Sequence, residues 1–182
     1  IVHFIKDIEL IEGDMRDQEI TDQAVEGIDM ILHEAALPSV PRSIKAPVTS
    51  NDVNIGGTLK LLSSAQKAGV QRMIMASSSS IYGNTAELPK HEGMTPKPMS
   101  PYAVTKLTGE HYLRIYHELY GMETLAIRYF NVFGPRQDPS SQYSGVIAKF
   151  MAAALDGSRY VVNGDGAQAR DFTYIDNVVK GN

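Results

Sequence analysis

A tyrosine and a lysine stand four residues apart in the stretch SPYAVTKLTGEHY, residues 100–112. Residues at this spacing lie on one face of a helix, so Tyr102 and Lys106 can face a common ligand. A neighbouring ammonium favours the ionised phenol, which predicts a pKa for Tyr102 below its usual value of about 10. Such a phenolate can take a proton from a sugar hydroxyl while hydride leaves the same carbon atom. The pair therefore indicates a site that oxidises an alcohol, and the lysine could also hold the ribose of a cofactor.

The pair alone is a weak signal, because nine tyrosines and ordinary lysine usage often give this spacing by chance. The serine run ASSSSIYG strengthens it. This run follows the apolar stretch RMIM, so Ser78 is predicted at the end of a buried strand, where its hydroxyl can donate to the oxygen that Tyr102 deprotonates. Serine, tyrosine and lysine together make an oxidation site that needs no metal. The alternatives are an ordinary strand-to-loop turn and a solvated lysine beside a half-buried tyrosine.

Helices and strands that could position these groups alternate along the chain. Segments of helical period, each closed by a glycine, are predicted at residues 53–70, 100–121 and 144–157. Short apolar stretches that pass into small or polar residues are predicted as strands at residues 8–14, 29–36, 72–80, 124–131 and 159–166. Buried strands separated by helices are typical of a parallel sheet covered on both faces. The predicted fold is therefore α/β, a doubly wound parallel sheet, whose ligands bind beyond the carboxyl ends of the strands.

A dinucleotide-binding sheet is expected to carry a glycine-rich turn after its first strand. The one formal match, GDGAQA at residues 164–169, precedes the β-prone RDFTYI rather than a helix, so we interpret it as a turn on the substrate side. Residues 1–13 read as linker and strand, and the last residues as a helix just begun at Asp176. The interpretation is a fragment of a Rossmann-type domain that lacks the first βαβ segment and the C-terminal part.

Composition argues against several other classes of protein. A net charge of -4 and a pI near 5.7 give no electrostatic reason to expect nucleic acid or an anionic membrane as partner. The chain has no cysteine and its five histidines form no i, i+4 pair, so no metal site is predicted. No apolar run approaches the roughly 20 residues that span a bilayer. We therefore expect a soluble and cytoplasmic protein.

Seven motifs, taken in order, carry a resemblance to a known family: GDMRD, HEAALPSVPRSI, NIGGT, ASSSSIYG, SPYAVTK, RYFNVFGPRQDP and GDGAQARDFTYIDN. They cover nearly all of the chain. The chain resembles the extended short-chain dehydrogenases/reductases, in particular the NAD-dependent nucleotide-sugar epimerases and dehydratases. Within that family it is most similar to UDP-N-acetylglucosamine 4-epimerases, followed by UDP-glucose 4-epimerases.

The resemblance implies a partial NAD-binding domain over residues 1–182, with residues 131–174 on the nucleotide-sugar side. The implied catalytic residues are Ser78, Tyr102 and Lys106, without a metal. The implied NAD contacts are Tyr102, Lys106, Asp14, Met15, Ala35, Ala36, Asn54, Tyr129 and Phe130. The implied contacts to a UDP-sugar substrate are Ser79, Asn131, Gln137 and Arg170. The guanidinium fork of Arg170 suits a pyrophosphate, and a structural pair with Asp165 or Asp171 is the alternative.

The activity implied is C4 epimerisation of a UDP-hexose or UDP-N-acetylhexosamine through a 4-keto intermediate, with Tyr102 as base. The expected assembly is a homodimer that pairs residues 57–68 and 101–120. Dehydratases of this family carry Asp-Glu directly after the catalytic hydroxyl residue, where this chain has Ser79 and Ser80, so dehydration is disfavoured. Two alternatives stay open: a nucleotide-sugar dehydratase or decarboxylase of the same fold, and an NAD-binding protein without catalytic activity.

Overall fold

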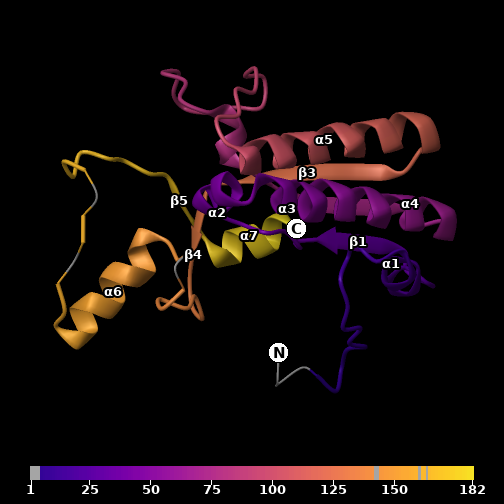
Figure 1. Cartoon of the computed structure of the whole chain (residues 1–182), viewed down its shortest axis with the longest axis horizontal. Coiled ribbons are helices and arrows are strands. Elements are labelled where there is room, and N and C mark those ends of the chain that lie inside the picture. Colours follow the sequence, from indigo (N-terminus) through magenta and orange to yellow (C-terminus); the bar gives the residue numbers. More distant parts are fainter. Residues whose placement is uncertain (1–4, 142–143, 160, 163) are drawn as a thin grey trace. The chain divides into compact units, whose positions relative to one another are not determined.

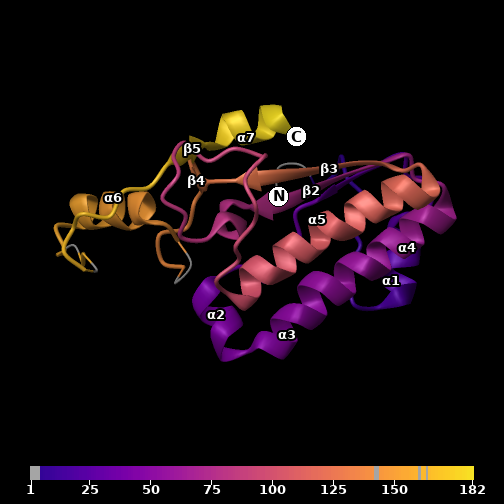
Figure 2. The same cartoon turned by 90° about the horizontal axis from the view of Figure 1, so that it is seen from above.

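The computed structural model describes residues 5–141, 144–159, 161–162 and 164–182. The chain divides into two compact units, Ile1–Ala126 and Ile127–Asn182. Figures 1 and 2 together label the helices and strands. The first unit contains α1 (Gln18–Ala24), β1 (Met30–His33), α2 (Val40–Lys45), α3 (Pro47–Asn51), the π-helical turn η1 (Asp52–Gly57), α4 (Thr58–Ala68), β2 (Arg72–Ser78), the 3₁₀ turn η2 (Ser79–Tyr82), α5 (Pro101–Tyr120) and the first residues of β3 (Glu123–Tyr129).

The sheet of the first unit has the strand order β1-β2-β3. β1 and β2 run parallel, with His33 opposite Met75, and the helices from α2 to α4 form the long crossover that parallel neighbours need. The central strand β2 is buried from Met73 to Ser77. This arrangement confirms the predicted α/β fold with a parallel sheet, and it brings the ends of β1 and β2 to one edge.

Helices α1, α4 and α5 lie side by side along one face of the strands (Figure 2). The core of this unit joins Met73 and Met75 of β2 to Leu62 of α4 and Leu113 of α5. A Cβ atom placed on Gly109 would stand 2.8 Å from the Cε atom of Met75, so the absence of a side chain there lets α5 approach the sheet closely. Helix α5 is thereby held directly on β2.

The helix ends expected from sequence are confirmed. In α5 the hydroxyl of Ser100 accepts the N–H of Ala103 at 3.1 Å, as an N-cap does. The helices α4, α5 and α6 each end at a glycine in the left-handed region, with φ values of 79°, 71° and 73° at Gly69, Gly121 and Gly157. The short helices α1, α2 and α3 were not predicted, and the start of the helix predicted at residues 53–70 forms the π-turn η1.

The second unit contains the end of β3, then β4 (Asn131–Phe133), α6 (Val146–Asp156), β5 (Phe172–Tyr174) and α7 (Ile175–Gly181). β4 and β5 pair in parallel, with Asn131 opposite Phe172. The ring of Phe133 packs against those of Phe172 and Tyr174, with ring centres 6.3 and 5.5 Å apart. The β-prone stretch after residue 169 and the helix near Asp176 are therefore confirmed.

Two of the predicted strands are wrong. The described part of residues 8–14 forms no strand, and Ile8 and Leu10 are about half exposed. Residues 159–166 likewise form no strand where they are described; Tyr160 and Asn163 of this prediction lie outside the described residues. An apolar stretch becomes a strand only when a neighbour pairs with its backbone groups. Neither stretch has such a neighbour among the residues that the structure describes.

Among the described residues, no helix is long and apolar enough to cross a lipid bilayer. The same residues contain no cluster of three or more histidine, aspartate or glutamate side chains that could hold a metal ion.

Candidate active site and nucleotide-sugar pocket

The first unit brings Ser78, Tyr102 and Lys106 together at the carboxyl end of β2. Ser78 is the last residue of that strand, and Tyr102 and Lys106 lie in the first two turns of α5. The side chains of Ser78 and Tyr102 are hydrogen-bonded to each other. The Nζ atom of Lys106 donates to the carbonyl oxygen of Ala76 at 2.7 Å and lies 6.0 Å from the centre of the Tyr102 ring. The three residues thus form one cluster on a strand end and the helix that covers it.

The hydroxyl oxygen of Ser78 has two hydrogen-bond partners. Its oxygen accepts the backbone N–H of Ser80 at 3.1 Å. Its hydrogen bond with Tyr102 lowers the pKa of the phenol. The Ser78 oxygen therefore lies between a backbone donor and the phenol.

The expected direction of the tyrosine pKa was wrong for this arrangement. Burial raises the pKa of Tyr102 above its usual value, and the hydrogen bond from Ser78 lowers it only in part. Burial also lowers the pKa of Lys106 to about 8, against the opposing effect of the nearby Glu34 carboxylate. The ammonium group of Lys106 is directed at Ala76, so desolvation of the phenol outweighs the attraction between phenolate and ammonium.

Asn54, predicted on the cofactor side, holds the loop after β1 against α5. Its Oδ1 atom accepts the N–H of Leu37 at 2.7 Å, and its Nδ2 atom donates to the Leu37 carbonyl and to the hydroxyl of Thr105, both at 3.1 Å. These bonds use both amide protons, and the residue is only 5% exposed. The segment that it fixes follows Ala35 and Ala36, at the carboxyl end of β1. Asn54, which belongs to the π-turn η1, therefore holds this loop in place.

His33 extends the same buried network, a role that sequence reasoning missed. The hydroxyl of Thr58 donates to the carbonyl of Asn54 at 2.7 Å, so its oxygen must accept the 2.9 Å hydrogen bond from Nε2 of His33. His33 is 4% exposed, and burial together with the nearby Lys106 cation lowers its pKa to about 4. The imidazole is therefore neutral at physiological pH, with its proton on Nε2.

The lowered pKa of His33 predicts a loss of stability on the acid side. The unfolded chain binds a proton at this histidine below about pH 6.5, whereas the folded chain does so only near pH 4. The free energy of unfolding should therefore fall as the pH drops from 6.5 to 4, by about 3 kcal/mol from this group. In His33→Gln, whose amide can still donate to Thr58, this part of the fall should vanish. Urea unfolding at several pH values measures it.

An exposed histidine of α5, His111, provides the control for this prediction. In His111→Gln the free energy of unfolding should keep the pH dependence of the parent. Identical acid-side slopes for His33→Gln and the parent would contradict a buried, neutral His33.

The residues predicted at the adenine lie on the segment before α1. The carboxylate of Asp14 accepts hydrogen bonds from the side chain and N–H of Arg16, which lower its pKa to about 2. Arg16 also pairs with Asp52 of η1 at 3.0 Å. Met15 packs on Gly57, where an added Cβ would stand 2.7 Å from the Cγ atom of Met15. The segment is therefore fixed against the turn that carries Asn54, with Asp14 exposed.

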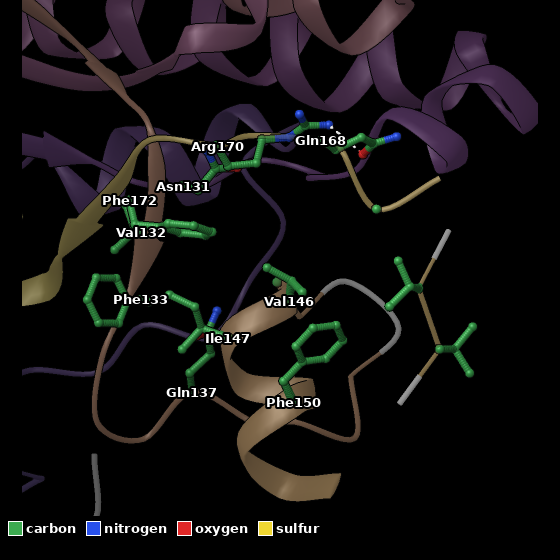
Figure 3. A pocket seen from close by; sticks show the side chains of 14 residues that line it. Asn131, Val132, Phe133, Gln137, Val146, Ile147, Phe150, Gln168, Arg170 and Phe172 are labelled. Carbon is green, nitrogen blue, oxygen red and sulfur yellow. Dashed lines mark hydrogen bonds between the residues drawn. The ribbon is translucent and has the colours of Figure 1, made fainter. Parts of the chain in front are cut away.

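Three predicted substrate residues line one cavity of the second unit. Asn131, Gln137 and Arg170 surround a space of about 440 Å³, together with apolar side chains from β4, α6 and β5 (Figure 3). Asn131 donates to the carbonyl of Asp171 at 2.7 Å. Arg170 donates to the carbonyl of Ala169 at 2.8 Å and to Oε1 of Gln168 at 3.2 Å. Of the described residues, Gln168 is thus a further polar member of this wall, and sequence reasoning missed it.

The remaining predicted residues have the following places. Ser79 begins the 3₁₀ turn η2 directly after Ser78. Tyr129 is the last residue of β3, and its hydroxyl donates to Oδ1 of Asn182 at 2.7 Å within the second unit. Phe130 lies between β3 and β4. The hydrogen bonds of Arg170 do not go to Asp165, whose carboxylate accepts the N–H of Ala167 instead.

Comparisons with known proteins agree with this fold. The model of the NAD dependent epimerase/dehydratase family matches residues 2–182, and the chain belongs to that family. A UDP-glucose 4-epimerase from Mycolicibacterium smegmatis is 39% identical over 94% of the chain and 55% of that protein. The structure of a UDP-N-acetylglucosamine 4-epimerase from Methanobrevibacter ruminantium, in complex with UDP-N-acetylmuramic acid, is 42% identical with a TM-score of 0.90, covering 94% of this chain and 55% of that one.

A dehydratase is also among the similar structures. A double mutant of the dTDP-glucose 4,6-dehydratase from Streptomyces venezuelae, solved with NAD bound, is 32% identical with a TM-score of 0.88, covering 99% of this chain and 55% of that chain. The chain thus spans about half the length of the relatives it matches. It has the parallel-sheet Rossmann-type fold of an NAD-dependent family whose members include both epimerases and dehydratases.

Proposed function

We propose that the whole protein is an NAD-dependent epimerase that inverts C4 of a UDP-hexose or UDP-N-acetylhexosamine through a 4-keto intermediate. The observation that carries this proposal is the hydrogen-bonded pair of Ser78 and Tyr102, with Lys106 in the same cluster at the carboxyl end of a parallel strand. Ligands of such sheets bind at this edge. A protein that only bound a dinucleotide would have no use for a phenol paired with a hydroxyl and a neighbouring lysine at this edge.

Residues of the first unit fit NAD. Ala35 and Ala36 have only methyl side chains at the end of β1, which leaves their backbone accessible to a pyrophosphate. One of the three N–H donors of Lys106 bonds to the carbonyl oxygen of Ala76, so two remain for ribose hydroxyls. Asp14 and Met15 are the proposed adenine contacts, while Asn54 acts by holding the loop beside Ala36. Tyr129 and Phe130 of the second unit are the proposed residues on the nicotinamide side.

In the proposed reaction Tyr102 takes the proton of the sugar C4 hydroxyl, and Ser78 donates a hydrogen bond to the oxygen from which the proton departs. NAD, when bound, accepts the hydride from C4 and returns it. Because burial raises the pKa of Tyr102, the phenol must first release its own proton to solvent before the phenolate can accept the proton of the sugar hydroxyl. Lys106 supplies the nearby positive charge that favours the phenolate once formed.

The cavity of the second unit is proposed to hold the nucleotide diphosphate. Arg170 presents a guanidinium fork suited to phosphate oxygens, and Asn131 and Gln137 add neutral hydrogen-bonding groups to the same wall. Residues 131–174 therefore form the proposed nucleotide-sugar side of the protein. Ser79, next to Ser78, is the proposed contact to the sugar.

A nucleotide-sugar dehydratase or decarboxylase is the second candidate, because a dehydratase is among the similar structures. Ser79 and Ser80 disfavour water loss, since hydroxyls at these positions replace the acid and base that dehydratases of the family use. A homodimer and a cytoplasmic location remain predictions.

Product analysis separates these candidates. The whole protein with NAD should convert UDP-glucose or UDP-N-acetylglucosamine, incubated separately, into a product of unchanged mass whose C4 configuration is inverted, as read by mass spectrometry and NMR. A product lighter by water or carbon dioxide would identify a dehydratase or decarboxylase. Bound NAD without conversion of any nucleotide sugar would contradict the catalytic proposal.

A further inference from the structure

The loop GDGAQA, residues 164–169, contributes no group to the proposed chemistry, yet its backbone conformation requires glycine at two positions. Gly164 and Gly166 both have φ of 81°, in the region that favours glycine. Between them, the carboxylate of Asp165 accepts the N–H of Ala167 at 3.0 Å, a local turn typical of aspartate. The loop then presents Gln168 and Arg170 at the cavity wall of the second unit (Figure 3).

Two neighbouring oxygen atoms accept hydrogen bonds from the guanidinium of Arg170. The carbonyl of Ala169 takes one N–H at 2.8 Å, and Oε1 of Gln168 takes another at 3.2 Å. From the adjoining strand, Asn131 holds the carbonyl of Asp171 at 2.7 Å and so fixes the backbone just after Arg170. A guanidinium has five N–H donors, so these bonds leave donors for a ligand.

The charge of the wall indicates which ligand this arrangement suits. Arg170 is the one charged side chain among the described residues that line the cavity, and the polar residues beside it are amides. An acid at position 168 would also orient the guanidinium, but it would neutralise the charge. A glutamine orients the guanidinium and leaves its positive charge available to an anion. Because Oε1 of Gln168 bonds to Arg170, its Nε2 atom keeps two N–H donors that an anion can accept.

We propose that Gln168 is a positioning residue of the nucleoside diphosphate site, which orients Arg170 and adds its own amide donors beside it. This inference rests on the proposed function, because that function gives the cavity a diphosphate ligand. It assigns a role to the glycine-containing loop, which brings the amide of Gln168 and the guanidinium of Arg170 together on one wall of the cavity.

Calorimetric titration of the whole protein with UDP, without turnover, tests the inference. Gln168→Glu should weaken UDP binding at least about tenfold, because the new carboxylate pairs with Arg170 and repels the diphosphate. Gln168→Met, of similar length but without hydrogen-bonding groups, should weaken it less, by about threefold to tenfold. NAD affinity should not change in either variant. Gln71→Glu, which adds the same charge at an exposed position of the first unit, should bind UDP as the parent does.

An Arg170→Met background separates positioning from a simple structural effect. If Gln168 acts mainly through the guanidinium, most of the effect of Gln168→Met should disappear once Arg170 is gone. An undiminished effect in that background, or parent-like UDP affinity of Gln168→Glu, would overturn the inference while leaving the proposed function intact. Failure of the parent protein to bind UDP would overturn the diphosphate role of the cavity, and the inference with it.

Discussion

Replacing Tyr102 with phenylalanine should lower kcat for UDP-sugar interconversion by about 10²–10⁴-fold, the usual contribution of a positioned acid–base group. The variant removes only the oxygen atom that is hydrogen-bonded to Ser78. The ring that packs beside Lys106 is retained, so NAD should still bind with an affinity close to that of the parent. Steady-state kinetics with a UDP-sugar, together with direct titration of NAD, measure the two effects separately.

Tyr120→Phe is the matched control, because Tyr120 lies on the same helix and is about half exposed. Its kcat should equal that of the parent. Parent-like turnover by Tyr102→Phe would show that another group removes the proton, and the assignment of the base would then be abandoned.

Replacing Lys106 with methionine should lower kcat by about 10²-fold or more and also weaken NAD binding. The ammonium is the cation of the cluster, and without it the buried phenolate would form in an environment that already raises the pKa of Tyr102. The methionine side chain fills a similar volume, so the contact of α5 with β2 should persist. Kinetics and NAD titration at pH 7 measure the losses.

The pH dependence of NAD binding gives this prediction a second readout. Because the pKa of Lys106 is lowered to about 8, its charge is present below that pH and is lost as the pH rises through it. NAD affinity of the parent should therefore decline between about pH 7 and pH 9. Lys106→Arg, which stays charged over this range, should show little decline even if its kcat is reduced. A decline of equal size in Lys106→Arg would mean that another group titrates.

Features that depend on local chemistry could be predicted from the sequence. Ser100 and Gly121 mark the ends of α5 by capping, and both ends are confirmed. The meeting of Ser78 with Tyr102 and Lys106 also followed from sequence, because a strand end and a helix start are adjacent in parallel α/β folds. The strands predicted at residues 8–14 and 159–166 failed since strand formation depends on a partner elsewhere in the chain, which an apolar pattern does not reveal.

Features that depend on burial and on distant partners could not be predicted. The direction of the Tyr102 pKa is set by desolvation, which spacing along a helix does not report. The amide of Asn54 reaches Leu37 and Thr105, which lie 17 and 51 residues away, so its part in holding the loop emerges only in three dimensions. One feature of the sequence could have identified Gln168 as a neighbour of Arg170. It stands two residues before Arg170, and alternate residues of an extended chain point to the same side.

The π-turn η1 limits how this region can vary in length. A residue in an α-helix is turned by about 100° from the one before it, since 3.6 residues complete a turn. The wider turn from Asp52 to Gly57 holds more residues than an α-helical turn of equal rise. Removing a single residue from it would swing Asn54 around the helix axis and away from Leu37, disconnecting the loop after β1 from α5. Evolution could thus exchange side chains in this segment far more readily than it could shorten it.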